Sequence, residues 1–140
     1  MQEWGFEEYI EPELTEEQQL AKTKQEKIEE VEQYDSSDAV NSFSINGQDM
    51  WLDTATRQQL KTSLDAYKAA EAETVAKWFN GIKYEFPLST WYQMLNALEI
   101  YASEALNTTE EHKSNILKLD TIEAVQNYDF TQGYPEKLAF

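Results

Sequence analysis

Residues 75–86 read Val75-Ala76-Lys77-Trp78-Phe79-Asn80-Gly81-Ile82-Lys83-Tyr84-Glu85-Phe86. Large apolar residues flank the central Asn80-Gly81 pair on both sides. Asn-Gly is the preferred pair for a two-residue type I′ turn, because both turn positions need a positive φ. The stretch therefore predicts a β-hairpin in which Phe79 pairs with Ile82.

This register separates the two faces of the predicted hairpin. One face carries side chains that are suited to burial, namely Val75, Phe79, Ile82, Tyr84 and Phe86. On the other face Trp78 lies opposite Lys83, a cross-strand pair that can make a cation–π contact.

The same pattern occurs earlier in the chain, as Ser42-Phe43-Ser44-Ile45-Asn46-Gly47-Gln48-Asp49-Met50-Trp51-Leu52. A type I′ turn at Asn46-Gly47 pairs Ile45 with Gln48. One face of this hairpin is then apolar, with Phe43, Ile45, Met50 and Leu52. Trp51 points to the opposite face.

Each predicted hairpin precedes a helix. Asp53 or Thr54 caps the first helix, whose apolar residues recur at helical spacing. Pro87 blocks continuation of the second hairpin, and Thr90 and Gln93 form a capping box. The packed face of this second helix is predicted to carry Trp91, Met94, Leu95, Leu98, Ala102, Ala105 and Leu106.

The two hairpin–helix units align at an offset of 34 residues, with matching turn, cap and aromatic positions. We interpret them as duplicated ββα units of an α+β fold. Because a lone hairpin is barely stable in water, the four strands are expected to form one four-stranded antiparallel sheet packed by helices. Capping boxes from Thr108 to Glu111 and from Asp120 to Glu123 predict two short C-terminal helices.

Charge divides the chain into two predicted parts. Residues 1–38 hold 13 acidic residues and 3 lysines, and residues 39–140 hold 14 acidic and 8 basic residues. We therefore expect an acidic N-terminal arm, 1–38, and a globular body, 39–140. The arm should contain one helix that begins at the capping box of Thr15 and Gln18 and ends near Asp35. Its apolar stripe is thin, which leaves a solvated helix and a coiled coil as open interpretations, and predicts that the body folds without the arm.

Composition excludes several classes of protein. The chain of 140 residues carries a net charge of −16, which argues against binding to nucleic-acid phosphates. It has no cysteine, so disulfide frameworks, thiolate zinc sites and cysteine nucleophiles are excluded, and a reducing compartment fits. No apolar run approaches the ~18 residues of a membrane span, and the first residues are acidic where a signal peptide is basic.

The sequence contains no motif that predicts an active site. The one histidine, His112, is expected to lie on the packed face of a helix and to bond to backbone or carboxylate groups. A zinc site would need further nitrogen or sulfur ligands. No phosphate-binding glycine loop or calcium loop occurs. We therefore predict no enzyme activity, no catalytic residue, no metal and no cofactor.

Aromatic residues provide the candidate binding positions. Four follow the last predicted helix, and this tail is expected to pack on its own domain, with docking to a partner as the alternative. The arm and the outer faces of the two hairpins carry the candidate partner-binding residues, namely Trp4, Phe6, Tyr9, Ile10, Trp51 and Trp78.

The order of several motifs resembles an uncharacterised family from tailed phages and from prophages of gut bacteria. These motifs are Asn46-Gly47, Met50-Trp51-Leu52, Arg57, Trp78-Phe79, Leu98-Glu99, Tyr101-Ala102, Asn107-x-Thr109-x-x-His112-Lys113, Leu119-x-Thr121, Tyr128-Asp129 and Gly133-Tyr134-Pro135-Glu136-Lys137-Leu138. The resemblance covers about residues 28–140. Members of this family often lie near, or are fused to, tail-fibre proteins, and the family has no established activity from which catalytic residues could be transferred.

The resemblance implies a non-enzymatic structural or assembly protein, either a tail-fibre accessory module or a chaperone. Its partner would be a phage structural protein or a second copy of the chain, in the host bacterial cytoplasm during assembly or in the virion. The alternative is a small acidic inhibitor or nucleic-acid mimic that binds a basic host protein.

Overall fold

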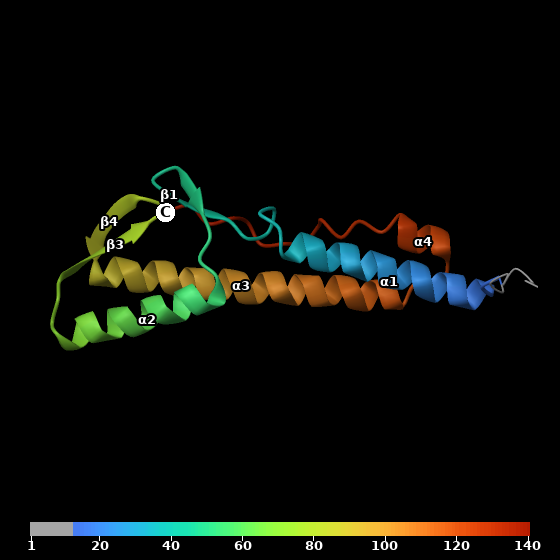
Figure 1. Cartoon of the computed structure of the whole chain (residues 1–140), viewed down its shortest axis with the longest axis horizontal. Helices are drawn as coiled ribbons and strands as arrows, with labels where there is room; N and C mark the ends of the chain where they lie inside the picture. The colour runs from blue at the N-terminus through green and yellow to red at the C-terminus, as the bar shows by residue number, and fades with distance from the viewer. Residues whose placement is uncertain (1–12) are drawn as a thin grey trace, which may run out of the picture.

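The computed structural model describes residues 13–140, which form an elongated α+β molecule (Figure 1). Trp4, Phe6, Tyr9 and Ile10 lie outside the described residues. The elements follow in the order α1 (Glu16–Asp35), β1 (Phe43–Ile45), β2 (Gln48–Met50), α2 (Thr54–Ala69), β3 (Thr74–Phe79), β4 (Ile82–Pro87), α3 (Leu88–Leu117) and α4 (Ile122–Gln126).

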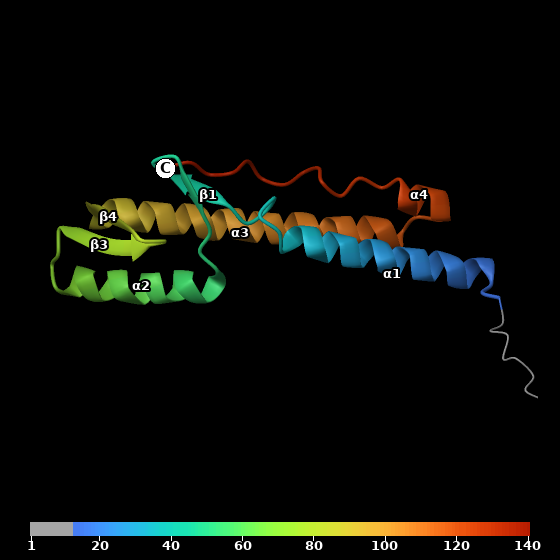
Figure 2. The ribbon, with the colours of Figure 1, turned by 45° about the horizontal axis from the view of Figure 1, so that its top comes forward.

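Helix α3 is the axis on which the other elements pack. Its 30 residues extend along most of the molecule, with α1 beside its C-terminal half and α2 beside its N-terminal half (Figures 1 and 2). The ion pair of Lys113 with Glu32 joins α3 to α1, and that of Arg57 with Glu99 joins α2 to α3. Helices α1 and α2 therefore follow one another along the length of α3, with α2 below α3 and the C-terminal end of α1 above it in the view of Figure 1.

Both predicted hairpins are confirmed, with the predicted registers. Phe43 pairs with Met50 in the first hairpin, and Phe79 pairs with Ile82 in the second. Both residues of each turn have positive φ, from 51° to 79°, as a type I′ turn requires. The apolar faces of both hairpins join one core with α2 and the N-terminal half of α3, except for Ile82, which was predicted to be buried and is 39% exposed because it lies beside the turn. This core contains Phe43, Ile45, Met50, Leu52, Leu60, Leu64, Val75, Tyr84, Trp91, Met94, Leu95 and Leu98.

The prediction of one four-stranded sheet is wrong, because the strands form two separate two-stranded sheets. Each hairpin instead lies with its apolar face on the helices. The chain's own C-terminal residues take the free edge of β1, where Ser44 and Ala139 form a parallel bridge. The amide of Ser44 donates to the carbonyl of Leu138, and the amide of Phe140 donates to the carbonyl of Ser44. These bonds supply the edge pairing that a third strand was expected to provide.

Helix α3 differs from the prediction at two places. It begins earlier than predicted, and it is not interrupted at Thr108, where a new helix was predicted. The helix begins at Leu88, before the predicted capping box, and has no side-chain cap. It continues through Thr108, whose hydroxyl donates to the carbonyl of Glu104 at 3.0 Å, as hydroxyls inside a helix commonly do. Burial of Thr109, His112 and Ile116 against neighbouring segments keeps this half helical.

Only one of the two predicted short C-terminal helices therefore exists, and it is α4. Its N-cap is Thr121, one residue after the predicted cap, and the Thr121 side chain accepts from the amide of Ala124. The tail beyond α4 runs back along the molecule to β1 (Figure 1). Tyr128, Phe130, Tyr134 and Leu138 pack against buried clusters, which confirms that the aromatic tail covers its own domain.

Helix α1 begins and ends as predicted, with both hydrogen bonds of the Thr15–Gln18 capping box present. It does not stand apart from the body. Val31, Ile116 and Val125 have no exposed surface and form a second core between α1, α3 and α4. The Lys24 and Lys27 side chains donate to the carbonyls of Leu117 and Gln126, at the C-terminal ends of α3 and α4. This packing predicts that the arm is needed for folding, contrary to the expectation from composition.

A hydrogen bond from Tyr92 on α3 to Asp65 on α2 predicts a measurable pKa effect. The Oη–Oδ1 distance is 2.7 Å. This bond, followed by that from Lys61, lowers the pKa of Asp65 from its ordinary 3.8, and the same carboxylate raises the pKa of Tyr92 to about 12. The bond stabilises the fold above pH ~4 and is lost as the pH falls through the lowered pKa of Asp65. We expect Tyr92→Phe to raise the pKa of Asp65 toward 3.8 in an NMR titration, whereas Tyr101→Phe should leave it unchanged.

Candidate protein-binding groove

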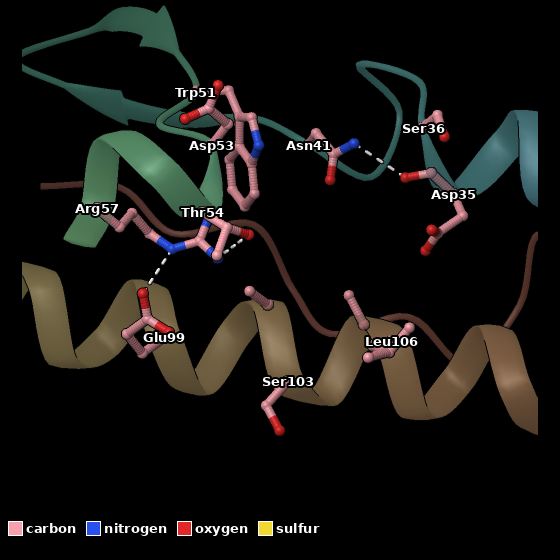
Figure 3. Close-up of a pocket in the computed structure, with 12 residues that line it drawn as sticks. Asp35, Ser36, Asn41, Trp51, Asp53, Thr54, Arg57, Glu99, Ser103 and Leu106 are labelled. Atoms are coloured by element: carbon pink, nitrogen blue, oxygen red, sulfur yellow. Dashed lines mark hydrogen bonds and ion pairs between the residues drawn. The ribbon is translucent and has the colours of Figure 1, made fainter. Parts of the chain in front are cut away.

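A groove lies beside α3 where α1 ends and α2 begins (Figure 3). Its volume is about 600 Å³. We call it the central groove, and define it by the residues that line it: Asp35, Ser36, Asn41, Trp51, Asp53, Thr54, Arg57, Glu99, Ala102, Ser103, Ala105 and Leu106. It exists because the two shorter helices leave a part of α3 uncovered between them.

The floor of the central groove comes from α3, with apolar Ala102, Ala105 and Leu106 beside polar Ser103 and Glu99. Ala102 and Ala105 are small, so the backbone of α3 lies close to the floor. Leu106 was predicted to lie in the core, yet 53% of its surface is exposed. That prediction is wrong because neither α1 nor α2 reaches far enough along α3 to cover this side chain. An exposed leucine within a groove is a surface that a partner could bury.

Arg57 fixes the wall formed by α2, and only 5% of its surface is exposed. Its Nε donates to Oε1 of Glu99 at 2.6 Å, and its Nη1 donates to the carbonyl of Leu52 at 2.6 Å. Its Nη2 reaches Oγ1 of Thr54 at 3.3 Å. The guanidinium also lies 5.5 Å from the ring centroid of Trp51, within cation–π range. One planar cation thus holds α2, α3 and the end of the first hairpin together.

Replacing Arg57 with lysine is expected to lower the free energy of unfolding by about 1–3 kcal/mol, because an ammonium group cannot reproduce three contacts in fixed directions. Glu99→Gln is the matched control. The Glu99 side chain is 53% exposed, so losing its charge should cost under about 1 kcal/mol. Urea unfolding of both variants measures the difference. Equal stability of Arg57→Lys and the wild type would contradict this role for Arg57.

Carboxylates outnumber cations in the central groove. Asp35, Asp53 and Glu99 line it with Arg57 as the one basic residue. Hydrogen bonds from Thr56 hold the pKa of Asp53 below its ordinary value, so Asp53 is ionised at neutral pH. The C-terminal end of α1 adds the negative end of a helix dipole, and the last turn of α1 has no basic residue. The side chains that line the groove therefore carry a net formal charge of −2, while the N-terminus of α2 places the positive end of a second helix dipole at Asp53 and Thr54.

The structure separates the two candidate tryptophans that it describes. Trp51 is half-buried in the central groove, where its ring meets that of Tyr101 at a centroid distance of 6.0 Å. Trp78 is 66% exposed on the other hairpin and does not line the groove. Its register opposite Lys83 is as predicted.

His112 has a structural role, as expected from the sequence. Its Nε2 lies 2.6 Å from the carbonyl oxygen of Gln132, and its Nδ1 lies 2.6 Å from the hydroxyl of Tyr128. Because a carbonyl only accepts, Nε2 donates to Gln132, while Nδ1 forms the second bond with the Tyr128 hydroxyl. The nearby Thr109 hydroxyl contacts Asp35 and Tyr134, each at 2.7 Å. This network attaches the C-terminal tail to α3 and α1.

Several groove residues escaped prediction as site residues. Arg57 and Glu99 entered only through the family resemblance, and Asp35 only as the end of a helix. They come together because α1 and α2 meet α3 at neighbouring places along that helix. Asp35, Arg57 and Glu99 themselves lie far apart in the sequence. No local motif predicts such an arrangement. An arginine among apolar helix residues does indicate that its charge is paired within the fold, because charged side chains are rarely buried alone.

Comparison of the chain with protein-family models, with curated proteins and with solved structures gave no match. No helix within residues 13–140 has the length and apolar character needed to cross a bilayer. In the same part of the chain, no group of three or more histidine or acidic side chains is placed to hold a metal ion.

Proposed function

We propose that this chain is a non-enzymatic protein-binding module that serves as a structural or assembly protein of a phage or prophage. The observation that carries the proposal is the central groove, which presents exposed Leu106 and half-buried Trp51 between helices held by Arg57. A preformed groove with apolar residues on its floor and a charged rim suits protein recognition. The phage context comes from the resemblance of residues 28–140.

The burial and hydrogen bonds of His112 support a role without catalysis. His112 is 8% exposed, and both of its ring nitrogens are engaged in bonds that hold the tail. A general base needs a ring nitrogen that is free to reach a substrate. Within residues 13–140, binding residues are therefore better supported than catalytic ones.

The proposed place of action is the tail fibre, as an accessory module in the virion or as a chaperone in the host cytoplasm. Purified virions and virion-free lysate of a phage that encodes this chain should be compared by affinity capture and mass spectrometry. Recovery with fibre protein in virions would support the accessory module, and recovery with fibre protein in lysate alone would support the chaperone. Failure to recover fibre protein from either fraction would contradict both roles.

The alternative proposal is an acidic inhibitor of a basic host protein. It is supported by the packing of α1 against the rest of the chain. A mimic needs carboxylates on a rigid face, and α1 is held by the buried side chain of Val31. Lys24 and Lys27 bind carbonyls of the body, which leaves exposed carboxylates such as Glu29 and Glu30 on the outer side of the helix. High salt should abolish binding by such a face and should scarcely affect binding at an apolar groove.

A further inference from the structure

We infer that the central groove takes an arginine or lysine side chain from a basic segment of the protein partner, next to an apolar side chain that covers Leu106. This inference rests on the proposed function as a protein-binding module, and it identifies the chemistry of the segment that the groove recognises.

The charges of the groove are only partly compensated from within the chain. Arg57 neutralises Glu99 through a bond of 2.6 Å. Asp35 and Asp53 form no ion pair with another described residue. Asp35 accepts a hydrogen bond from Thr109 through Oδ1, and its Oδ2 has no hydrogen bond to the part of the chain that the structure describes. Asp35 therefore retains an acceptor for a cationic donor.

The end of α1 differs from the ends of the two helices beside it. Lys24 donates to the carbonyl of Leu117, the last residue of α3, and Lys27 donates to the carbonyl of Gln126, the last residue of α4. These ammonium groups compensate the negative ends of two helix dipoles. Among the described residues, no lysine donates to a backbone carbonyl in the last turn of α1. The carbonyl of Asp35 accepts from the side-chain amide of Asn41, that of Tyr34 accepts from the amide and hydroxyl of Ser37, and Lys113 pairs with the side chain of Glu32. A cation from a partner would complete the same arrangement at the third helix end.

The apolar residues of the floor indicate a peptide segment rather than a free ion. Figure 3 shows Leu106 lying between Asp35 at one end of the groove and Arg57 with Glu99 at the other. A small inorganic cation at Asp35 would leave Leu106 uncovered. A segment with a basic side chain beside an apolar one fits both the Asp35 carboxylate and the exposed Leu106. Its charge pairs with Asp35, and its apolar group covers Leu106.

The net charge of the chain indicates which of the possible ligands can occupy the central groove. A second copy would bring another net charge of −16, and residues 1–12 of the same chain contain four acidic residues and no basic one. Both would be repelled by the groove. Nucleic acid is excluded by the same argument. A basic segment of another protein is attracted at long range by the net charge and held at short range by the groove.

The test uses the full chain, labelled with ¹⁵N, and a synthetic peptide, acetyl-Gly-Leu-Arg-Leu-Gly-amide. The control peptide carries citrulline, which has nearly the shape of arginine but no charge, in place of arginine. We expect the arginine peptide to shift, in a saturable way, the indole N–H signal of Trp51 and the amide signals of Ser36 and Leu106. The citrulline peptide should bind about three- to fivefold more weakly, as expected for the loss of an exposed ion pair.

Two variants locate the site. Asp35→Asn keeps an oxygen that can accept from Thr109, so the fold should persist. This variant should bind the arginine peptide only as tightly as the wild type binds the citrulline peptide. Asp65→Asn removes a carboxylate outside the groove and should have no effect on binding. Equal binding of both peptides, or shifts confined to the outer side of α1, would overturn the inference.

The outcome is distinguishable from failure of the proposed function. If fibre protein is captured by the wild type and by Asp35→Asn with equal affinity, the basic-segment inference is wrong and the protein-binding function stands. If the arginine peptide binds in the groove but no phage protein is captured, the tail-fibre role is wrong and the inference about the groove stands.

Discussion

Removing residues 1–38 is expected to unfold the C-terminal half of α3 together with α4. The second core loses Val31, and Ile116 and Val125, which now have no exposed surface, become accessible to water. Burial of an aliphatic side chain contributes about 1.5–3 kcal/mol, so the three account for up to about 9 kcal/mol. That loss is comparable with the whole stability of an ordinary domain, ~5–15 kcal/mol. Circular dichroism should show less helix, and sedimentation should show aggregation.

A point variant separates the loss of the core from the loss of the segment. Val31→Asp places a carboxylate in a site with no exposed surface and should reproduce much of the effect. Glu29→Asp, on the exposed side of the same helix, should leave the melting temperature nearly unchanged. A truncated chain that melts like the full chain and keeps α3 helical would show that the arm is dispensable, as its composition first indicated.

Trp91→Ala is expected to lower the free energy of unfolding by about 3–5 kcal/mol, the usual cost of truncating a buried aromatic side chain. Only 2% of Trp91 is exposed. Its ring meets those of Phe86 and Phe79 edge-on, at centroid distances of 5.2 and 6.2 Å. Its Nε1 donates to the carbonyl of Val75 at 2.8 Å, so the variant also leaves that carbonyl without its partner.

Urea unfolding measures this loss, and two further variants control it. Trp91→Phe keeps most of the packing and removes the hydrogen bond, so it should cost less than Trp91→Ala. Ile100→Ala removes an apolar side chain from the same helix at a position that is 60% exposed, and should change stability by under about 0.5 kcal/mol. Similar losses for Trp91→Ala and Ile100→Ala would mean that the first core has been placed wrongly.

The hairpins could be predicted in detail because their information is local. Asn46-Gly47 and Asn80-Gly81 need no distant partner to favour positive φ, and a two-residue turn fixes the register of the strands that it joins. The caps at Thr15 and Asp53 are local for the same reason. The common origin of the two ββα units stays a prediction.

The errors lie where distant segments decide the structure. A Thr-x-x-Glu pattern at Thr108 is compatible with a new helix, yet burial of Ile116 against α1 favours continuation of the old one. The thin apolar stripe of α1 looked inadequate because its complement comes from α3 and α4, which lie about 90 residues further along the chain. The edge of β1 was paired by Ala139, at the far end of the sequence.

The central groove could not be predicted for a related reason. Leu106 follows the helical pattern of a core residue, and only the lengths and positions of α1 and α2 leave it uncovered. Trp51 was recognised as a candidate for binding because it was predicted to point away from the apolar face of its hairpin, whereas its ring packs edge-on against Phe43 of that face. Its neighbours Arg57 and Glu99 are brought to it by the packing of α2 on α3.

The role of the central groove in protein binding is tested most directly by comparing two glutamate substitutions on α3. Leu106→Glu places a charge on the exposed floor of the groove, and Ile100→Glu places the same charge at an exposed position that does not line the groove. Binding of the captured fibre protein to each variant should be measured by calorimetry. We predict that Leu106→Glu weakens binding by at least about tenfold, as for a central interface residue, while Ile100→Glu binds like the wild type. Equal affinities of the two variants and the wild type would contradict the groove as the binding surface.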